Sequence, residues 1–109
     1  MRADLEIIQE WIPAGSRVLD LGCGNGELLA WLTEHKQVSG YGLEIDADNI
    51  AQCVSKGVNV IEQNLDKGLS NFASSSFDVV VMTQSLQALH YPDKVLAEML
   101  RVGKTCIIT

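Results

Sequence analysis

The sequence has little positive charge and no long apolar run. Its 109 residues carry 8 Lys and Arg against 14 Asp and Glu, a formal net charge of −6. This balance argues against a nucleic-acid backbone or an anionic membrane surface as a partner. No apolar run approaches the roughly 18 residues of a membrane-spanning helix, and the first residues lack the layout of a signal peptide. We therefore expect neither nucleic acid nor membrane as a partner.

Cysteines are also few. Cys23, Cys53 and Cys106 form an odd, scattered set without C-x-x-C spacing. Such a set supports neither a disulfide framework nor a zinc site. The sequence therefore predicts no metal, and a reducing cytoplasm is the expected location.

Apolar residues make up 47% of the chain and charged residues 20%, which is typical of one globular domain over residues 1–109. Apolar strand-like runs alternate with amphipathic segments, so we predict an α/β fold with a doubly wound parallel sheet. In the segment 46–56, capped by Asp46, we expect Ala47, Ile50, Ala51 and Val54 to face inward. The predicted strands are 17–21, 38–44, 58–61, 77–82 and 105–109, and the predicted helices are 4–12, 27–36, 46–56 and one that starts near Pro92 and closes at Gly103.

The most informative stretch is V-L-D-L-G-C-G-N-G, residues 18–26. A buried strand there runs into three alternate glycines and then into a helix, so unpaired N–H groups at the helix start can cradle a polar ligand. Asp20 ends the strand, where its carboxylate can meet a ligand ammonium. Glu44 ends the next predicted strand, where it can accept from both ribose hydroxyls. The simpler alternative is a tight turn with solvent-facing carboxylates.

These residues resemble the first motif of the class I S-adenosylmethionine-dependent methyltransferases, whose fold is Rossmann-like. Residues 1–32, 40–46 and 77–104 more narrowly resemble the methionine-biosynthesis family MetW. The resemblance implies S-adenosylmethionine as cofactor and a strand order of 3-2-1-4-5. It also assigns the cofactor contacts: Asp20 to the methionine ammonium, the backbone of Gly22, Cys23 and Gly24 to close approach, Glu44 to the ribose, and Ile45 and Leu65 to the two faces of the adenine.

Three assignments beyond the first two strands depend on the same resemblance. Asn64 stands where relatives usually carry an acid that accepts from the adenine amino group, and Asp66 competes for that role if the loop shifts. Thr83, with the residues after it, is expected beside the methyl-transfer position. His90 invites a general-base reading, but members of the family often carry a histidine near this point without a demonstrated need for it, so no catalytic residue is predicted.

Complete members of the methyltransferase class add two further strands beyond the fifth, so we expect this chain to be an incomplete domain, truncated after the fifth strand. Residues 105–109 would then form an exposed edge through which a homodimer could pair. The methyl acceptor is not identified by the sequence.

A second reading, from the same MetW resemblance, is a non-catalytic regulatory or partner subunit of homoserine O-acyltransferase. A nicotinamide-dinucleotide enzyme is disfavoured because the glycine spacing is G-x-G-x-G and not G-x-G-x-x-G.

Overall fold

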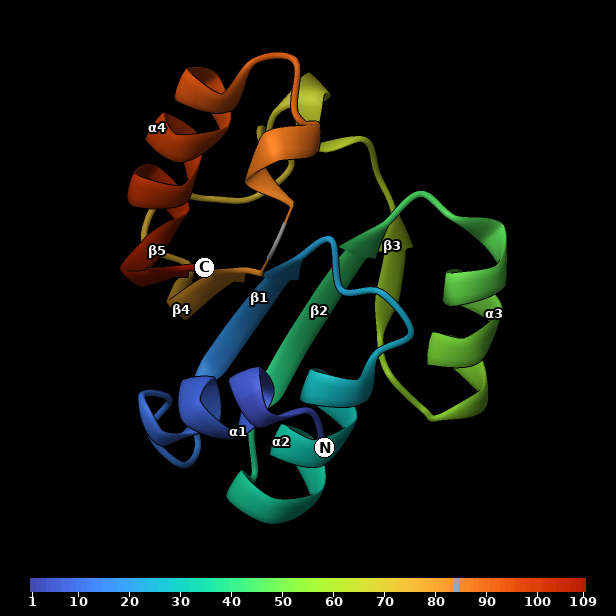
Figure 1. Cartoon of the computed structure of the whole chain (residues 1–109). Helices are drawn as coiled ribbons and strands as arrows, with labels where there is room; N and C mark the ends of the chain where they lie inside the picture. The colour runs from blue at the N-terminus through green and yellow to red at the C-terminus, as the bar shows by residue number, and fades with distance from the viewer. Residues whose placement is uncertain (84) are drawn as a thin grey trace.

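Five parallel strands form the centre of the molecule, in the order β3-β2-β1-β4-β5 (Figure 1). This computed structural model describes residues 1–83 and 85–109. The predicted doubly wound sheet and its strand order are confirmed. The strands are β1 (Arg17–Leu21), β2 (Ser39–Glu44), β3 (Val60–Glu62), β4 (Phe77–Met82) and β5 (Gly103–Ile108). The α-helices are α1 (Ala3–Glu10), α2 (Glu27–Lys36), α3 (Ala47–Ser55) and α4 (Pro92–Val102), and two short 3-10 helices are η1 (Leu65–Lys67) and η2 (Leu86–Ala88).

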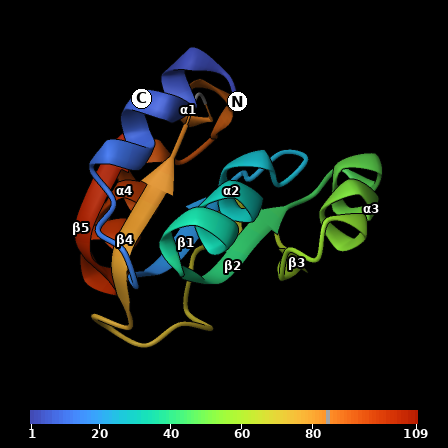
Figure 2. The same ribbon diagram turned by 90° about the horizontal axis from the view of Figure 1, so that it is seen from below.

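Two apolar layers cover the two faces of the sheet. Successive side chains of a strand point to opposite faces, so Val79 and Val81 of β4 join a core with α1 and α2. Val80 and Met82 join the other core with α4. Figure 2, seen from below, shows α2 in front of β1 and β2, with α3 beyond β3 at that end of the sheet. All β4 residues except Asp78 are buried, so this strand separates two helical layers, as its apolar run predicted.

The strand boundaries shift by two residues at β3, which begins at Val60 and not at residue 58, and at β5, which begins at Gly103 and not at residue 105. Gly103 therefore ends α4 and starts β5 without any connecting loop. Among the described residues, β5 pairs only with β4 and is an edge of the sheet, as expected. No helix of the described part of the chain is long and apolar enough to cross a membrane.

The inward face predicted for α3 is wrong. Val54 is 65% exposed, whereas Cys53 is fully buried. The helix packs on the short edge strand β3 and on the glycine loop, and a Cβ built at Gly26 would lie 3.0 Å from Cys53 Sγ. Close approach to the loop therefore sets the rotation of α3, and the apolar spacing within the helix does not. The predicted cap is confirmed, because the Asp46 side chain accepts from the Asp48 N–H at 3.3 Å.

Candidate functional site

The site lies where the carboxyl ends of β1, β2, β3 and β4 meet, the usual ligand position in open α/β sheets. The glycine loop after β1 turns sharply there. Gly22 has a φ of 72°, and a Cβ at this position would lie 2.5 Å from Ser85 Oγ. The N–H groups of Gly22 and Cys23 both donate to the carbonyl of Leu43, at 2.8 and 3.0 Å. These bonds fix the loop against the end of β2.

The Asp20 carboxyl is almost fully buried, with 3% exposure, at the end of β1. No partner among the described residues reaches its Oδ1 atom. The pKa of Asp20 is raised to about 7, mainly by burial and also by the nearby negative Glu44, while Arg2 opposes both effects. A buried carboxylate without a partner is unfavourable, so this group is poised to receive a cationic ligand group. The alternative of a solvent-facing carboxylate is wrong for Asp20.

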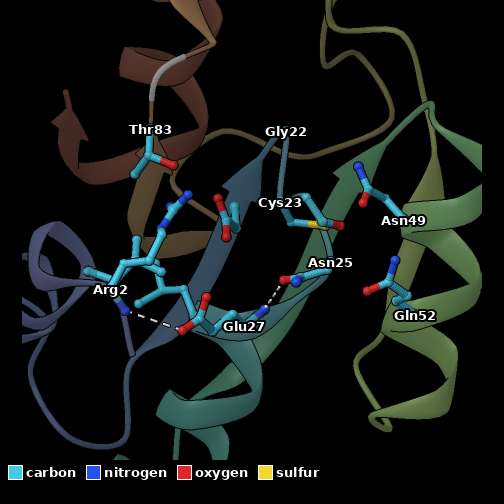
Figure 3. Close-up of a pocket in the computed structure, with 12 residues that line it drawn as sticks. Arg2, Gly22, Cys23, Asn25, Glu27, Asn49, Gln52 and Thr83 are labelled. Carbon is cyan, nitrogen blue, oxygen red and sulfur yellow. Dashed lines mark hydrogen bonds between the residues drawn. The ribbon is translucent and has the colours of Figure 1, made fainter.

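Asp20 faces a hollow of about 330 Å³ that is rimmed mainly by polar groups (Figure 3). Arg2 reaches it from the N-terminal side, and Asn49 and Gln52 approach from α3, on the far side of the glycine loop. Arg2 is anchored by its backbone N–H, which donates to Glu27 Oε1 at 3.3 Å. The hollow therefore combines a buried acid with a basic side chain. The lining residues of this first hollow are Arg2, Leu5, Asp20, Gly22, Cys23, Gly24, Asn25, Glu27, Leu28, Asn49, Gln52 and Thr83.

The Glu44 carboxylate is held by two backbone donors at the end of β2. Its Oε1 atom accepts from the Gly24 N–H at 2.9 Å, and its Oε2 atom accepts from the Asp46 N–H at 3.1 Å. A carboxylate has about four lone-pair sites, so both oxygens retain acceptor capacity for a ligand. The side chain is half-buried and faces a second hollow.

The second hollow, of about 360 Å³, lies between the ends of β2 and β3 and the segment that precedes α4. It shares Gly22 with the first hollow, so the two adjoin at the glycine loop. Ile45 is 63% exposed on its rim, and Leu65 is almost buried. The lining residues are Gly22, Leu43, Glu44, Ile45, Gln63, Asn64, Leu65, Asp66, Ser85, Ala88, Leu89 and His90.

All nine sequence-predicted residues line one or the other hollow. The first holds Asp20, Gly22, Cys23, Gly24 and Thr83, and the second holds Gly22, Glu44, Ile45, Asn64 and Leu65. Gln84, which follows Thr83, lies outside the described residues. Sequence reasoning missed Arg2, Asn49 and Gln52. A single basic residue ahead of the first helix carries no local signal, and the polar residues of α3 are found only through the rotation of that helix.

The two candidates for the adenine amino group have different environments. Asn64 Oδ1 accepts from the Asp66 N–H at 3.0 Å and so starts η1. The Asp66 carboxylate instead accepts from the backbone N–H groups of His90 and Tyr91. Asp66 is thus engaged by backbone, while Asn64 stays at the border of the hollow.

Two thiols support the glycine loop from behind. Cys23 Sγ lies 3.8 Å from Cys53 Sγ, and the Cys53 thiol donates to the Gly24 carbonyl at 3.3 Å. Burial raises the pKa of both thiols. Protonated, buried thiols are poor nucleophiles, so their contribution here is packing and loop support.

Comparisons with known proteins identify the family and the fold. Residues 2–109 match the family model described as methionine biosynthesis protein MetW. The bifunctional methionine biosynthesis protein MetXA/MetW of Rhodopirellula baltica is 40% identical over 117 residues, covering 100% of this chain and 19% of that relative. The chain therefore spans about a fifth of the length of this relative.

Solved structures share the fold. A SAM-dependent methyltransferase from Archaeoglobus fulgidus superposes with a TM-score of 0.82 and 26% identity, covering 94% of this chain and 46% of that one. The [4+2]-cyclase SpnF superposes with a TM-score of 0.80 and 24% identity, covering 92% of this chain and 40% of that one. The architecture is that of the class I Rossmann-like methyltransferases, and one protein that shares it is a cyclase.

Proposed function

Because this chain belongs to the MetW family of methionine biosynthesis proteins, we propose that it binds S-adenosylmethionine as a methyltransferase-like protein linked to methionine biosynthesis. The observation that carries the proposal is the Asp20 carboxyl, which is buried at the floor of the first hollow with an unpartnered oxygen. A ligand ammonium would supply the missing partner. Arg2, on the same hollow, would bind the neighbouring carboxylate through charge-assisted hydrogen bonds.

The rest of the ligand would cross the glycine loop into the second hollow. The backbone at Gly22, Cys23 and Gly24 leaves room for close approach, because two of these positions carry no side chain. Glu44 would accept from the ribose hydroxyls with the acceptor capacity that its two backbone donors leave. Two adjoining hollows that share Gly22 match an elongated ligand with an amino-acid end and a nucleoside end.

The adenine would lie between Ile45 and Leu65. Ile45 is 63% exposed, so a base stacked on it would bury apolar surface that is otherwise open to water. Asn64 would accept from the adenine amino group through its amide oxygen. This contact lacks the charge of the acid that relatives usually carry there.

The cofactor supplies a methyl group on a sulfonium centre, activated for direct displacement. The contribution of the protein is therefore orientation. Thr83, after β4 and on the first hollow, would lie beside the methyl group. His90 lies on the second hollow, on the adenine side, so we propose no acid–base role for it.

Calorimetric titration with S-adenosylmethionine and S-adenosylhomocysteine tests this proposal. We expect micromolar binding to the wild type and at least about tenfold weaker binding to Glu44→Ala, because one charged hydrogen-bond acceptor contributes on the order of 1.5–3 kcal/mol. Glu62→Ala is the matched control, since Glu62 pairs with Glu44 in the β2–β3 register but lines neither hollow. Absence of binding to the folded wild type, or equal affinities of the two variants, would contradict the proposal.

A second candidate is a non-catalytic partner or regulatory subunit of homoserine O-acyltransferase. The bifunctional relative MetXA/MetW favours this association. In that protein a MetW region is fused in one polypeptide to MetXA, and such a fusion suggests association with homoserine acyltransferase. The fold is shared with the [4+2]-cyclase SpnF, and one fold can carry different functions. Under this reading the site would sense S-adenosylmethionine. Co-purification of this chain with the acyltransferase, combined with cofactor binding and no methyl transfer to cell extract, would favour the second candidate.

Self-association through β5 is a further proposal. This strand is an edge of the described sheet, and open strand edges favour pairing with another chain. Light scattering should then give the mass of a dimer, and the backbone amides of residues 103–108 should show slow hydrogen exchange. A monomer with that strand fully protected would argue against pairing. We also propose a cytoplasmic location, where the three free thiols would stay reduced.

A further inference from the structure

Asp66 connects two parts of the second hollow that are far apart in sequence. It lies in η1, just after β3, and its Oδ1 atom accepts from the His90 and Tyr91 N–H groups, each at 3.0 Å. Its Oδ2 atom also lies 3.2 Å from the His90 nitrogen. Both donors belong to the turn that leads into α4.

This contact caps α4 from outside the helix. Tyr91 is the N-cap residue of α4, and its own side chain makes no capping hydrogen bond. The first N–H groups of a helix have no partner within it, and a negative charge near them is favourable. The Asp66 carboxylate supplies such a charge and two charge-assisted acceptors, which are stronger than neutral ones.

The capped turn is also a wall of the second hollow. Ala88, Leu89 and His90 line it together with Glu44 and Ile45. The Asp66 N–H is itself bound by Asn64 Oδ1 at 3.0 Å. A continuous path of hydrogen bonds therefore runs from Asn64, through Asp66, to the start of α4.

We propose that Asp66 is a positioning residue for the adenine-side hollow. It holds residues 88–90 in place as a wall and does not itself accept a hydrogen bond from the base. This inference rests on the proposed binding of S-adenosyl ligands. It also separates the roles of two neighbours: Asn64 contacts the base, and Asp66 shapes the cavity that receives it.

The test compares two ligands across three variants by calorimetry. The ligands are S-adenosylhomocysteine and its hypoxanthine analogue, S-inosylhomocysteine, which lacks the amino group. We expect Asp66→Ala to weaken the binding of both ligands by the same factor, about tenfold or more, because two hydrogen bonds to a charged group are lost. Asp66→Asn keeps an acceptor suited to helix capping, so its affinity for both ligands should stay within about threefold of the wild-type affinity.

Asp93→Ala is the matched control. It removes an exposed acid from the first turn of the same helix and should leave the affinity unchanged. Three results would overturn the inference: equal affinities of the Asp66→Ala and Asp93→Ala variants, an Asp66→Asn variant as weak as Asp66→Ala, or loss of the preference for one ligand over the other in Asp66→Ala. The last result would mean that Asp66 contacts the base directly.

Hydrogen exchange of the His90 and Tyr91 amides provides a readout that needs no ligand. Exchange should be faster in Asp66→Ala than in wild type or Asp93→Ala, and unchanged exchange would overturn the inference. If the wild type binds neither nucleoside, the proposed function fails, while this measurement still decides whether Asp66 holds the turn.

Discussion

Replacing Asp20 by Asn should change how stability depends on pH. Burial raises the pKa of Asp20 from 3.8 to about 7 in the folded protein, with Glu44 adding to the effect and Arg2 opposing it. The folded state therefore keeps a proton between about pH 4 and pH 7 that the unfolded chain has lost. By linkage, stability falls as pH rises through this window. Three pKa units correspond to about 4 kcal/mol, since one unit is about 1.4 kcal/mol.

The Asn variant cannot ionise, so this pH-dependent term disappears. Urea unfolding followed by circular dichroism would give the free energy of unfolding of both proteins at pH 5 and pH 8. The difference between variant and wild type should move in favour of Asp20→Asn by about 3 kcal/mol between these pH values, because only about two pH units of the window lie above pH 5, each worth about 1.4 kcal/mol. Other groups that titrate in this range are common to both proteins and cancel in the comparison. A difference that stays constant with pH would refute the assignment of a raised pKa to Asp20.

Ligand affinity provides the second half of the same prediction. Only the ionised Asp20 can pair with an ammonium, so wild-type affinity for S-adenosylmethionine should be about tenfold weaker at pH 6 than at pH 8, as expected for a group with a pKa near 7. Asp20→Asn should bind more weakly at pH 8 and show no such pH dependence. Affinity that is independent of pH in the wild type would contradict the role of Asp20.

Two further substitutions test the amino-acid end of the site and the support of α4. Arg2→Ala should weaken the binding of S-adenosylhomocysteine about tenfold. In parallel titrations it should leave the affinity for 5′-methylthioadenosine, which lacks the amino-acid group, unchanged. Equal losses of affinity for both ligands would argue against a carboxylate contact. Arg101 donates to the carbonyls of Leu69 and Phe72 at 2.9 and 3.0 Å, so Arg101→Ala should lower the free energy of unfolding measured in urea titrations, because both carbonyls lose a charged donor. A free energy of unfolding equal to that of the wild type would show that these bonds contribute little.

Most of the fold was predictable because its signals are local. The apolar run at residues 77–82 and the glycines after residue 21 need only neighbouring residues to be interpreted, and both predictions are confirmed. The face of α3 was not predictable in this way. Val54 fits an apolar helical spacing, but the loop at Gly26 admits Cys53 instead, and that contact joins segments nearly thirty residues apart.

The candidate site was likewise predictable where its signals are local and not predictable where they depend on packing. Strand ends in a parallel sheet gather at one edge, so the order of strands and polar residues in the sequence was enough to bring Asp20, Glu44 and Asn64 to one region. Their individual states depended on packing. The burial that raises the pKa of Asp20 comes from the layer that α1 and α2 form over the face of β1 that Asp20 shares with Val18, and no property of the residue itself predicts it.

The sequence by itself determined the alternation of strands and helices, the sharp glycine turn and the residues that end each strand, because these depend on local periodicity and backbone freedom. Only the tertiary structure decided that Arg2 joins the hollow at Asp20 and that the Asp66 carboxylate accepts from the backbone N–H groups of His90 and Tyr91. Both outcomes depend on distances between segments that are remote in the chain. Such distances are fixed by how the helices pack on the sheet, so they cannot be predicted from local sequence.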